Sequence, residues 1–218
     1  MILRLLASAC LLAVCQSAAA QAPGSGEERF YGRESFTIVS QLTGSETGSV
    51  TEHVRDWGRV RSEIGKSTTK IGGMSVARDN RIVYEGAKVT TIDAKTAQIT
   101  STTNPFYPTF VSAMKGKDPM KFGEEMMTRM GGRKTGEKAN IASHDCEYWT
   151  LMSVKTCVTA WGATLHTSSS MAGIAKERKA TEVRLGDKGP DAAFAYDASK
   201  AKAQPNIQDV LKNIPGRN

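Results

Sequence analysis

Methionine is the residue type in this sequence whose spacing most suggests a ligand site. Met114, Met120, Met126, Met127 and Met130 lie within seventeen residues of one another. The thioether side chain is flexible and polarisable, and it suits a surface that accepts apolar molecules of variable shape. Met120, Met127 and Met130 share one face of a helix, because spacings of seven and three residues return to the same side. The cluster predicts either a helix packed on a core or a lid whose three methionines contact an apolar ligand.

The N-terminus has the pattern of an export signal. Arg4 precedes an apolar run from Leu5 to Val14, which is too short to span a bilayer, and small residues follow at Ala18-Ala19-Ala20. We therefore expect residues 1–20 to be a signal peptide, cleaved near Ala20-Gln21, and the mature chain to be periplasmic. A lipoprotein signal ending at Cys15 is the alternative, but Val14 is a branched residue where such a signal needs a small one.

Two cysteines, Cys146 and Cys157, remain after residues 1–20 are removed. An even number of cysteines in an exported chain favours a disulfide. The segment between them contains a plausible reversal at Leu151-Met152, which would place Cys146 opposite Cys157 on antiparallel strands. Metal ligation is the alternative, because His144 lies two residues before Cys146. The chain-entropy estimate for a disulfide closing such a loop is roughly 3 kcal/mol.

No spacing in the sequence predicts catalysis or a cofactor. The chain has no C-x-x-C and no H-x-x-x-H for zinc, and its methionines form no M-x-M cluster with histidine for copper. Ser143-His144-Asp145 contains the residue types of a hydrolase triad, but neighbours on a strand point to opposite faces of the sheet. We expect no catalytic residue, no resident metal and no cofactor.

The charge is moderately basic and scattered. The 218 residues carry 29 basic and 22 acidic side chains, and removing the signal peptide takes away Arg4 alone, leaving 28 basic against 22 acidic residues, a net charge of +6. Few aromatic residues lie between the basic ones, so a nucleic-acid partner is not expected. The charge is that of an ordinary soluble surface or, alternatively, of a face attracted to an anionic membrane surface or envelope polymer.

Most of the chain has the alternation of strands. From Phe36 to Leu42 apolar and polar residues alternate, and 44–49 has the composition of a turn. Short turns and the lack of strand–helix–strand units favour an antiparallel sheet. Further strands are expected at 50–64, interrupted by a bulge at Gly58, and then at 73–77, 81–84, 88–92, 98–102, 142–151, 155–165 and around 181–185.

Helices are expected in two places. Asp118-Pro119 is a helix N-cap followed by proline at the first helical position, and Gly131-Gly132 ends that helix. A second short helix is expected from Gln204-Pro205 to Ile214, which Pro215-Gly216 ends. The fold class is therefore α+β: a curved antiparallel sheet, or incomplete β-barrel, covered by two or three short helices. Residues 21–32 are expected to be a flexible lead-in, and residues 33–218 a single domain.

Three segments resemble the LolA/LolB-like periplasmic carriers and their uncharacterised relatives. They are EHVRDWGRVRSEI at 52–64, RIVYEGAKVTTIDAKTAQITSTTNP at 81–105 and ANIASHDCEYWTLMSVKTCVTAWGATL at 139–165. The resemblance runs in order over residues 33–186, and this chain departs from it at the segment 104–140 and in its cysteine pair. It implies an incomplete curved barrel, closed by helices, that holds acyl chains or another apolar ligand.

The sequence therefore gives two hypotheses of different classes. The first is a periplasmic, non-enzymatic protein that binds an apolar or lipidic ligand in the curve of the sheet, in lipid or lipoprotein transport. The second is a structural or interaction protein of the cell envelope, which uses a cationic face and has no ligand cavity. Its partners would be the anionic membrane surface or another envelope protein.

Overall fold

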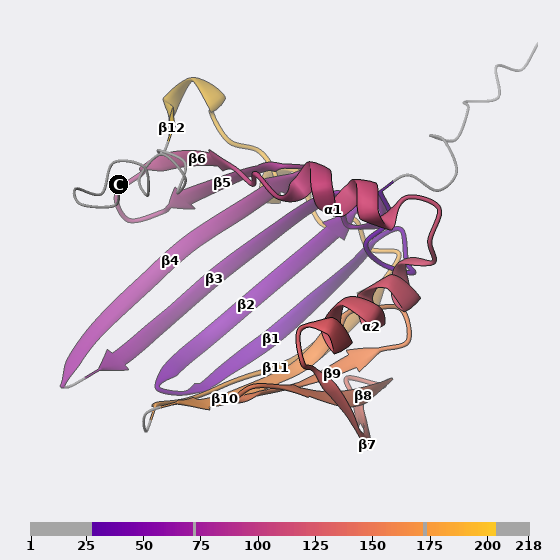
Figure 1. Ribbon diagram of the computed structural model, residues 1–218. Coiled ribbons are helices and arrows are strands. Elements are labelled where there is room, and N and C mark those ends of the chain that lie inside the picture. The colour runs from indigo at the N-terminus through magenta and orange to yellow at the C-terminus, as the bar shows by residue number, and fades with distance from the viewer. Residues whose placement is uncertain (1–27, 72, 172–173, 204–218) are drawn as a thin grey trace, which may run out of the picture.

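The computed structural model describes residues 28–71, 73–171 and 174–203, and it contains one continuous sheet of twelve strands (Figure 1). The order across the sheet is β12-β6-β5-β4-β3-β2-β1-β11-β10-β9-β8-β7. The strands are β1 (Phe36–Gly44), β2 (Glu46–Arg55), β3 (Val60–Ile71), β4 (Met74–Glu85), β5 (Lys88–Asp93), β6 (Ile99–Thr103), β7 (Arg133–Ile141), β8 (His144–Leu151), β9 (Val154–Thr159), β10 (Thr164–Met171), β11 (Ile174–Leu185) and β12 (Ala201–Ala203).

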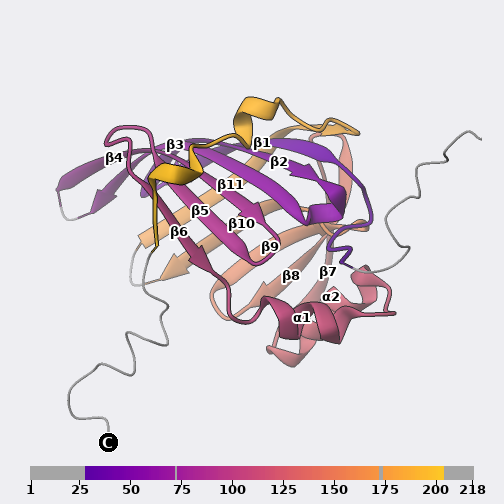
Figure 2. The ribbon, with the colours of Figure 1, turned by 90° about the horizontal axis from the view of Figure 1, so that it is seen from above.

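All neighbouring strands are antiparallel except β12, which pairs in parallel with β6. The sheet curves strongly and does not close into a barrel, so β7 and β6 lie near its two edges (Figures 1 and 2). The chain passes from β6 to β7 through two helices, α1 (Tyr107–Met114) and α2 (Pro119–Arg129), which lie on the inner side of the curve. The predicted fold class, an α+β curved antiparallel sheet with short helices, is confirmed.

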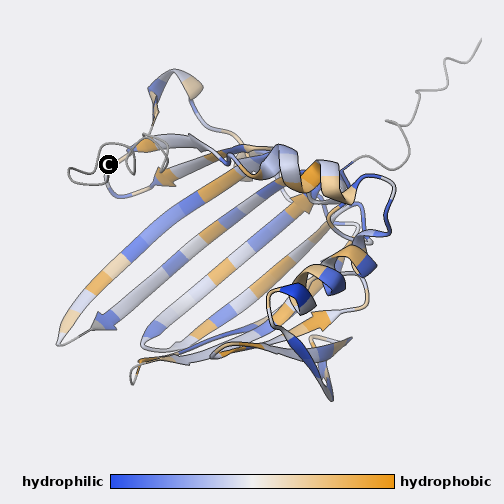
Figure 3. Ribbon diagram, viewed as in Figure 1, coloured by the Kyte–Doolittle hydropathy of each residue, from blue (hydrophilic) through white to orange (hydrophobic). Residues whose placement is uncertain are grey.

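The core gathers where β1, β2 and β7–β11 curve around one another. Its fully buried side chains include Phe36 and Ile38 of β1, Val54 of β2 and Leu165 of β10. Along these strands such residues alternate with exposed or polar ones, as in Figure 3, because successive side chains of a strand point to opposite faces. The core thus joins β1 and β2 to the strands β7–β11, and hydrogen-bonded ladders join the remaining strands to them.

The interrupted strand predicted over 50–64 is wrong: it is a hairpin. β2 and β3 are antiparallel, and the 3-10 turn η1 (Asp56–Gly58) joins them. Asp56, Trp57 and Gly58 all have positive φ, so the turn uses the left-handed region three times in succession. Gly58 makes the close approach that the sequence suggests, because a Cβ there would overlap the ring of Tyr31.

Other strand boundaries also differ from the predictions. The expected turn at 78–81 lies inside the single strand β4, where these polar residues pair with β3. β7 lies within the segment 104–140, where no strand is predicted, and the predicted strand 155–165 is divided into β9 and β10 by a turn at 160–163. β11 begins seven residues before the predicted 181–185. The predicted helix at 204–214 lies outside the described residues.

A C-terminal segment crosses the outer, convex side of the sheet, opposite the helices (Figure 2). It contains two 3-10 turns, η2 (Asp191–Ala193) and η3 (Ala198–Lys200), and ends in β12. Arg55 donates hydrogen bonds from Nε to the carbonyl of Lys188 at 2.5 Å and from Nη2 to that of Gly189 at 2.7 Å. The Ser62 hydroxyl donates to the carbonyl of Ala193 at 2.6 Å. This segment buries His53, which lies against Phe194.

The end of the predicted lead-in, residues 28–32, belongs to the folded part. The N–H of Phe30 donates to the carbonyl of Trp57 at 2.8 Å, and the ring of Tyr31 packs edge-on against Phe36. Residues 21–27 lie outside the described residues. Among the helices of the described part, none has both the length and the apolar character needed to cross a bilayer.

Candidate ligand cavity beneath helix α2

Helix α2 is delimited by the signals that the sequence predicts. The Asp118 carboxylate accepts hydrogen bonds from the N–H groups of Met120 at 3.0 Å and Lys121 at 2.9 Å, which satisfies two free donors of the first turn. At the other end Gly131 has a φ of 88°, and the N–H of Gly132 donates to the carbonyl of Met127 at 2.8 Å. The predicted N-cap and glycine stop are confirmed.

None of the side chains of α2 is buried. In α1, by contrast, Met114 is only 4% exposed. A surface helix normally buries an apolar stripe against the core, and that burial supplies most of its stability. Helix α2 has such a stripe, but the stripe faces a space that is only partly filled. It therefore covers a cavity rather than completing a core.

The space beneath α2 is a cavity of about 910 Å³. Helix α2 forms its roof, strands β7–β9 and the beginning of β10 form its floor, and Phe30 closes it from the N-terminal segment. The volume lies within the range of about 300–1,000 Å³ that is usual for pockets of small-molecule ligands. The larger apolar side chains that line it are Phe30, Pro119, Met120, Met126, Met127, Trp149 and Val158, and its charged side chains are Glu124, Lys138, Asp145 and Glu147.

The register of β8 and β9 brings the floor of the cavity together. Trp149 pairs with Thr156, and Glu147 pairs with Val158, so these four side chains share one face of the two strands. The alternate pair, Tyr148 and Cys157, takes the opposite face. The floor thus presents the indole of Trp149, the isopropyl group of Val158 and the carboxylate of Glu147.

A single lysine connects the roof to the floor. Lys134, on the edge strand β7, has its Nζ 2.8 Å from the Glu124 carboxylate of α2 and 3.3 Å from that of Glu147 on β8. Its ammonium also lies 5.2 Å from the centre of the Trp149 ring. These contacts raise the pKa of Lys134, first through the hydrogen bond to Glu124. Lys134 therefore stays charged at neutral pH and holds α2 over the cavity.

A second, smaller cavity adjoins the first at Thr164, which lines both. It encloses about 270 Å³ and is polar, since two arginines and two glutamates face it. Arg178 contacts Glu52 at 3.3 Å and Glu63 at 3.1 Å, and Arg61 lies 3.6 Å from Glu52. Burial raises the pKa of the Glu52 carboxyl above its usual value, and the two arginines oppose that effect. The methionines of α2 and Trp149 thus line the first cavity, and the cluster of arginines and glutamates lines the second.

The structure places the three methionines predicted as ligand contacts differently. Met120 and Met127 line the cavity beneath α2, whereas Met130 is 50% exposed and lies outside the lining. Helix α2 ends at Arg129, so Met130 follows the last helical residue and leaves the common face. Met126 lines the cavity instead. The sequence did not predict three other residues of the lining, Trp149, Val158 and Phe30. Only the strand register and the packing of the N-terminal segment bring them to α2.

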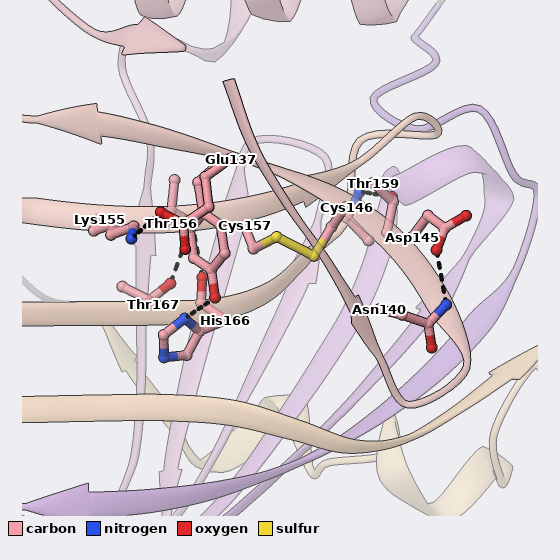
Figure 4. The surroundings of a disulfide bond; sticks show 12 residues. Glu137, Asn140, Asp145, Cys146, Lys155, Thr156, Cys157, Thr159, His166 and Thr167 are labelled. Carbon is pink, nitrogen blue, oxygen red and sulfur yellow. Dashed lines mark hydrogen bonds and ion pairs between the residues drawn. A yellow bond between two sulfur atoms is a disulfide. The ribbon is translucent and has the colours of Figure 1, made fainter. Parts of the chain in front are cut away.

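Cys146 and Cys157 form a disulfide that links β8 to β9, with their Cα atoms 5.4 Å apart (Figure 4). The predicted reversal between the strands is present, but the two cysteines are not directly opposite: Cys157 pairs with Tyr148 and Cys146 with Thr159. Cys146 is also one of the residues that line the cavity. The disulfide therefore fixes the two strands that carry Trp149 and Val158. Within the described residues no group of histidine, cysteine and carboxylate side chains is arranged to hold a metal.

Neither a family model nor a curated protein sequence matches this chain. Among solved structures, an uncharacterized conserved protein from Thermus thermophilus superposes with a TM-score of 0.50 at 10% identity, over 78% of this chain and 90% of that one. At this identity the likeness extends to the fold and no further.

MucB, alone and in complex with MucA(peri), superposes with TM-scores of 0.41 and 0.39 at 10% and 12% identity. These superpositions cover 76% and 75% of this chain. They cover 58% and 54% of the MucB chains, so this chain spans little more than half of their length.

Proposed function

We propose that the protein is an exported, non-enzymatic binding protein that holds an apolar or lipidic ligand between helix α2 and the sheet. One observation carries the proposal: an amphipathic helix with no buried side chain covers a cavity of about 910 Å³ lined by methionine, tryptophan and valine. A ligand that covers these apolar side chains removes their surface from water, which is favourable.

The lining also indicates the class of ligand. Met120, Met126 and Met127 have unbranched side chains that can adapt to a flexible chain. The second cavity, with its arginines and glutamates, adjoins the first at Thr164. An amphipathic molecule with one acyl chain therefore fits best, with its chain beneath α2 and its polar end toward Thr164.

The predicted export signal supports a setting for this activity. A chain cleaved near Ala20-Gln21 would be periplasmic, where a disulfide such as Cys146–Cys157 forms and persists. A soluble protein with an acyl-chain cavity in that compartment would carry its ligand between membranes or hold it for a partner. Transport of lipid or lipoprotein is the role that this combination supports.

Filling the cavity tests the proposal. The delipidated protein is titrated with a long-chain fatty acid and with a lysophospholipid, by calorimetry, beside the variant Val158→Trp. The indole of the variant would occupy the space beneath α2, so binding should fall at least tenfold while the melting temperature stays the same or rises. Lys202→Trp, an exposed position on the edge strand β12, is the matched control and should bind as the wild type does. Equal binding by Val158→Trp, or no binding by the wild type, contradicts the proposal.

A further inference from the structure

The exposed apolar side chains of the described residues gather at one end of the sheet. Eight large hydrophobic residues are exposed, and five of them are Met74, Val76, Met152, Met171 and Ile174. Single exposed hydrophobic residues are normal on a protein surface, but a group of them marks an interaction site. The position of these five residues in the fold is therefore informative.

All five lie at hairpin ends that point the same way. In an antiparallel sheet alternate connections fall at the same end, and here the β3–β4, β8–β9 and β10–β11 connections do so. Met74 begins β4, Met171 ends β10, and Met152 lies between β8 and β9. Figure 1 shows the long β3–β4 and β10–β11 hairpins extending from the sheet away from α1 and α2.

The three methionines project into solvent without support from the fold. Met152 is 94% exposed, Met74 69% and Met171 68%. Met152 also has a positive φ of 54°, in a turn where a small polar residue or glycine would be less strained. Three long apolar side chains at three hairpin ends on the same side of the sheet are unfavourable in water and serve no packing in the described structure.

The ends are close enough to touch one surface together. β10 and β9 are neighbours, and β3 is separated from β11 by only β2 and β1. With strands about 4.8 Å apart, the β3–β4 and β10–β11 ends lie roughly 15 Å from each other along the sheet. That span matches a contact with a flat surface better than insertion of all the ends into one protein pocket.

The charges beside these ends are positive. Lys70 and Arg78, on the two strands of the β3–β4 hairpin, and Arg133, opposite Thr150 near the β8–β9 end, are exposed. None of the three forms an ion pair with another described residue. The nearby acids Asp79 and Glu46 are paired, with Lys66 at 3.7 Å and Lys176 at 3.2 Å. The unpaired charge at this end is therefore basic.

We propose that this end of the sheet, defined by Met74, Met152 and Met171, docks on the surface of an anionic lipid bilayer. The methionines insert among the headgroups, and Lys70, Arg78 and Arg133 contact lipid phosphates. Apolar side chains beside basic ones are the pattern of reversible binding at a membrane interface. Each basic residue near the surface raises the affinity for an anionic bilayer about fivefold. The contact is separate from the cavity beneath α2 and does not depend on it.

Vesicle co-sedimentation tests this docking. The exported protein is mixed with vesicles of phosphatidylcholine and phosphatidylglycerol at 3:1, and with phosphatidylcholine alone, in low salt. We expect binding to the anionic vesicles that falls at least tenfold in the triple variant Met74→Ser, Met152→Ser, Met171→Ser. A Lys70→Glu, Arg78→Glu variant should fall by at least as much. The control, Phe106→Ser with Leu185→Ser, removes two exposed hydrophobic side chains elsewhere and should bind as the wild type does.

A second measurement locates the contact. Mild peroxide oxidises exposed methionines, and mass spectrometry of peptides reports each one. Anionic vesicles should protect Met74, Met152 and Met171 and leave Met130 as reactive as before. The proposal is overturned if the wild type does not bind, if it binds neutral vesicles equally, if the triple variant binds undiminished, or if the three methionines stay reactive on the vesicle.

Discussion

The Nζ of Lys134 lies 2.8 Å from the Glu124 carboxylate, and this ion pair joins the edge strand β7 to the roof helix α2. Both side chains are partly exposed, and pairs of this kind contribute about 0.2–1 kcal/mol. That is small for the stability of the whole fold. It is large for a helix with no buried side chain, whose attachment to the sheet depends on few contacts.

The first prediction concerns this attachment. Lys134→Met should change the melting temperature little but speed ligand release up to about fivefold, because α2 would open more often. The rate is measured by stopped-flow transfer of a fluorescent fatty acid to vesicles. In the wild type, 1 M salt should speed release in the same way, since it screens the ion pair. Lys121→Met, an exposed lysine on α2 without an ion pair to another described residue, is the control; equal rates for the two variants would contradict the prediction.

The second prediction separates a lid from a core helix. Met127→Ala should lower the free energy of unfolding by about 1 kcal/mol or less, because its side chain already faces a cavity, and should weaken ligand binding severalfold. Met114→Ala in α1 is the matched comparison. Met114 is buried, so its truncation should cost about 2–5 kcal/mol. Denaturant unfolding measures both, and an equal loss in the two variants would mean that α2 is an ordinary core helix.

The third prediction concerns the disulfide. Replacing both Cys146 and Cys157 by alanine should lower the free energy of unfolding by roughly 3 kcal/mol, the value expected from the loop that the bond closes. Because the bond holds β8 to β9, ligand affinity should fall as well. Non-reducing peptide mapping of the exported protein comes first and should find the two cysteines linked. Two free thiols there would refute the assignment.

The fourth prediction is a pH dependence that originates at His53. Burial lowers the pKa of His53 below its ordinary value of 6.5, and Asp187 opposes that shift. As pH falls below 6.5 the unfolded chain takes up this proton first, so the stability that neutral His53 provides is complete above pH 6.5 and is lost on acidification. His53→Gln should flatten the fall in unfolding free energy between about pH 7 and pH 5. An unchanged slope in His53→Gln would contradict the prediction.

The fold class could be predicted because alternation of apolar and polar residues is a local signal. The N-cap of α2 is local too, since Asp118 and Pro119 specify it directly. The η1 hairpin could not be predicted, because Asp56 and Trp57 adopt positive φ under tertiary constraint while the alternation continues on either side. At 78–81 a strand forms where a turn was predicted. These residues have turn propensity, but they remain in β4 because each of them pairs with a residue of β3.

The cavity was predicted only on its helical side. Met120 and Met127 follow from helical spacing, but Trp149 and Val158 come to the same floor through the pairing of β8 with β9, which leaves no local trace in the sequence. Phe30 lies far away in the chain and reaches the cavity because its N–H binds the carbonyl of Trp57. Contacts between residues so far apart in the chain become evident only in the three-dimensional arrangement of the strands.

The central claim is that the space beneath α2 holds an apolar ligand in the cell, and native mass spectrometry tests it most directly. The protein is purified without detergent from the cells that produce it naturally, sprayed intact, and then activated until any bound molecule leaves. We predict one added mass per chain, released as a molecule with an acyl chain and absent from Val158→Trp prepared in the same way. A wild-type protein that arrives at its bare mass, and that takes up no fatty acid or lysophospholipid when these are added, would contradict the claim.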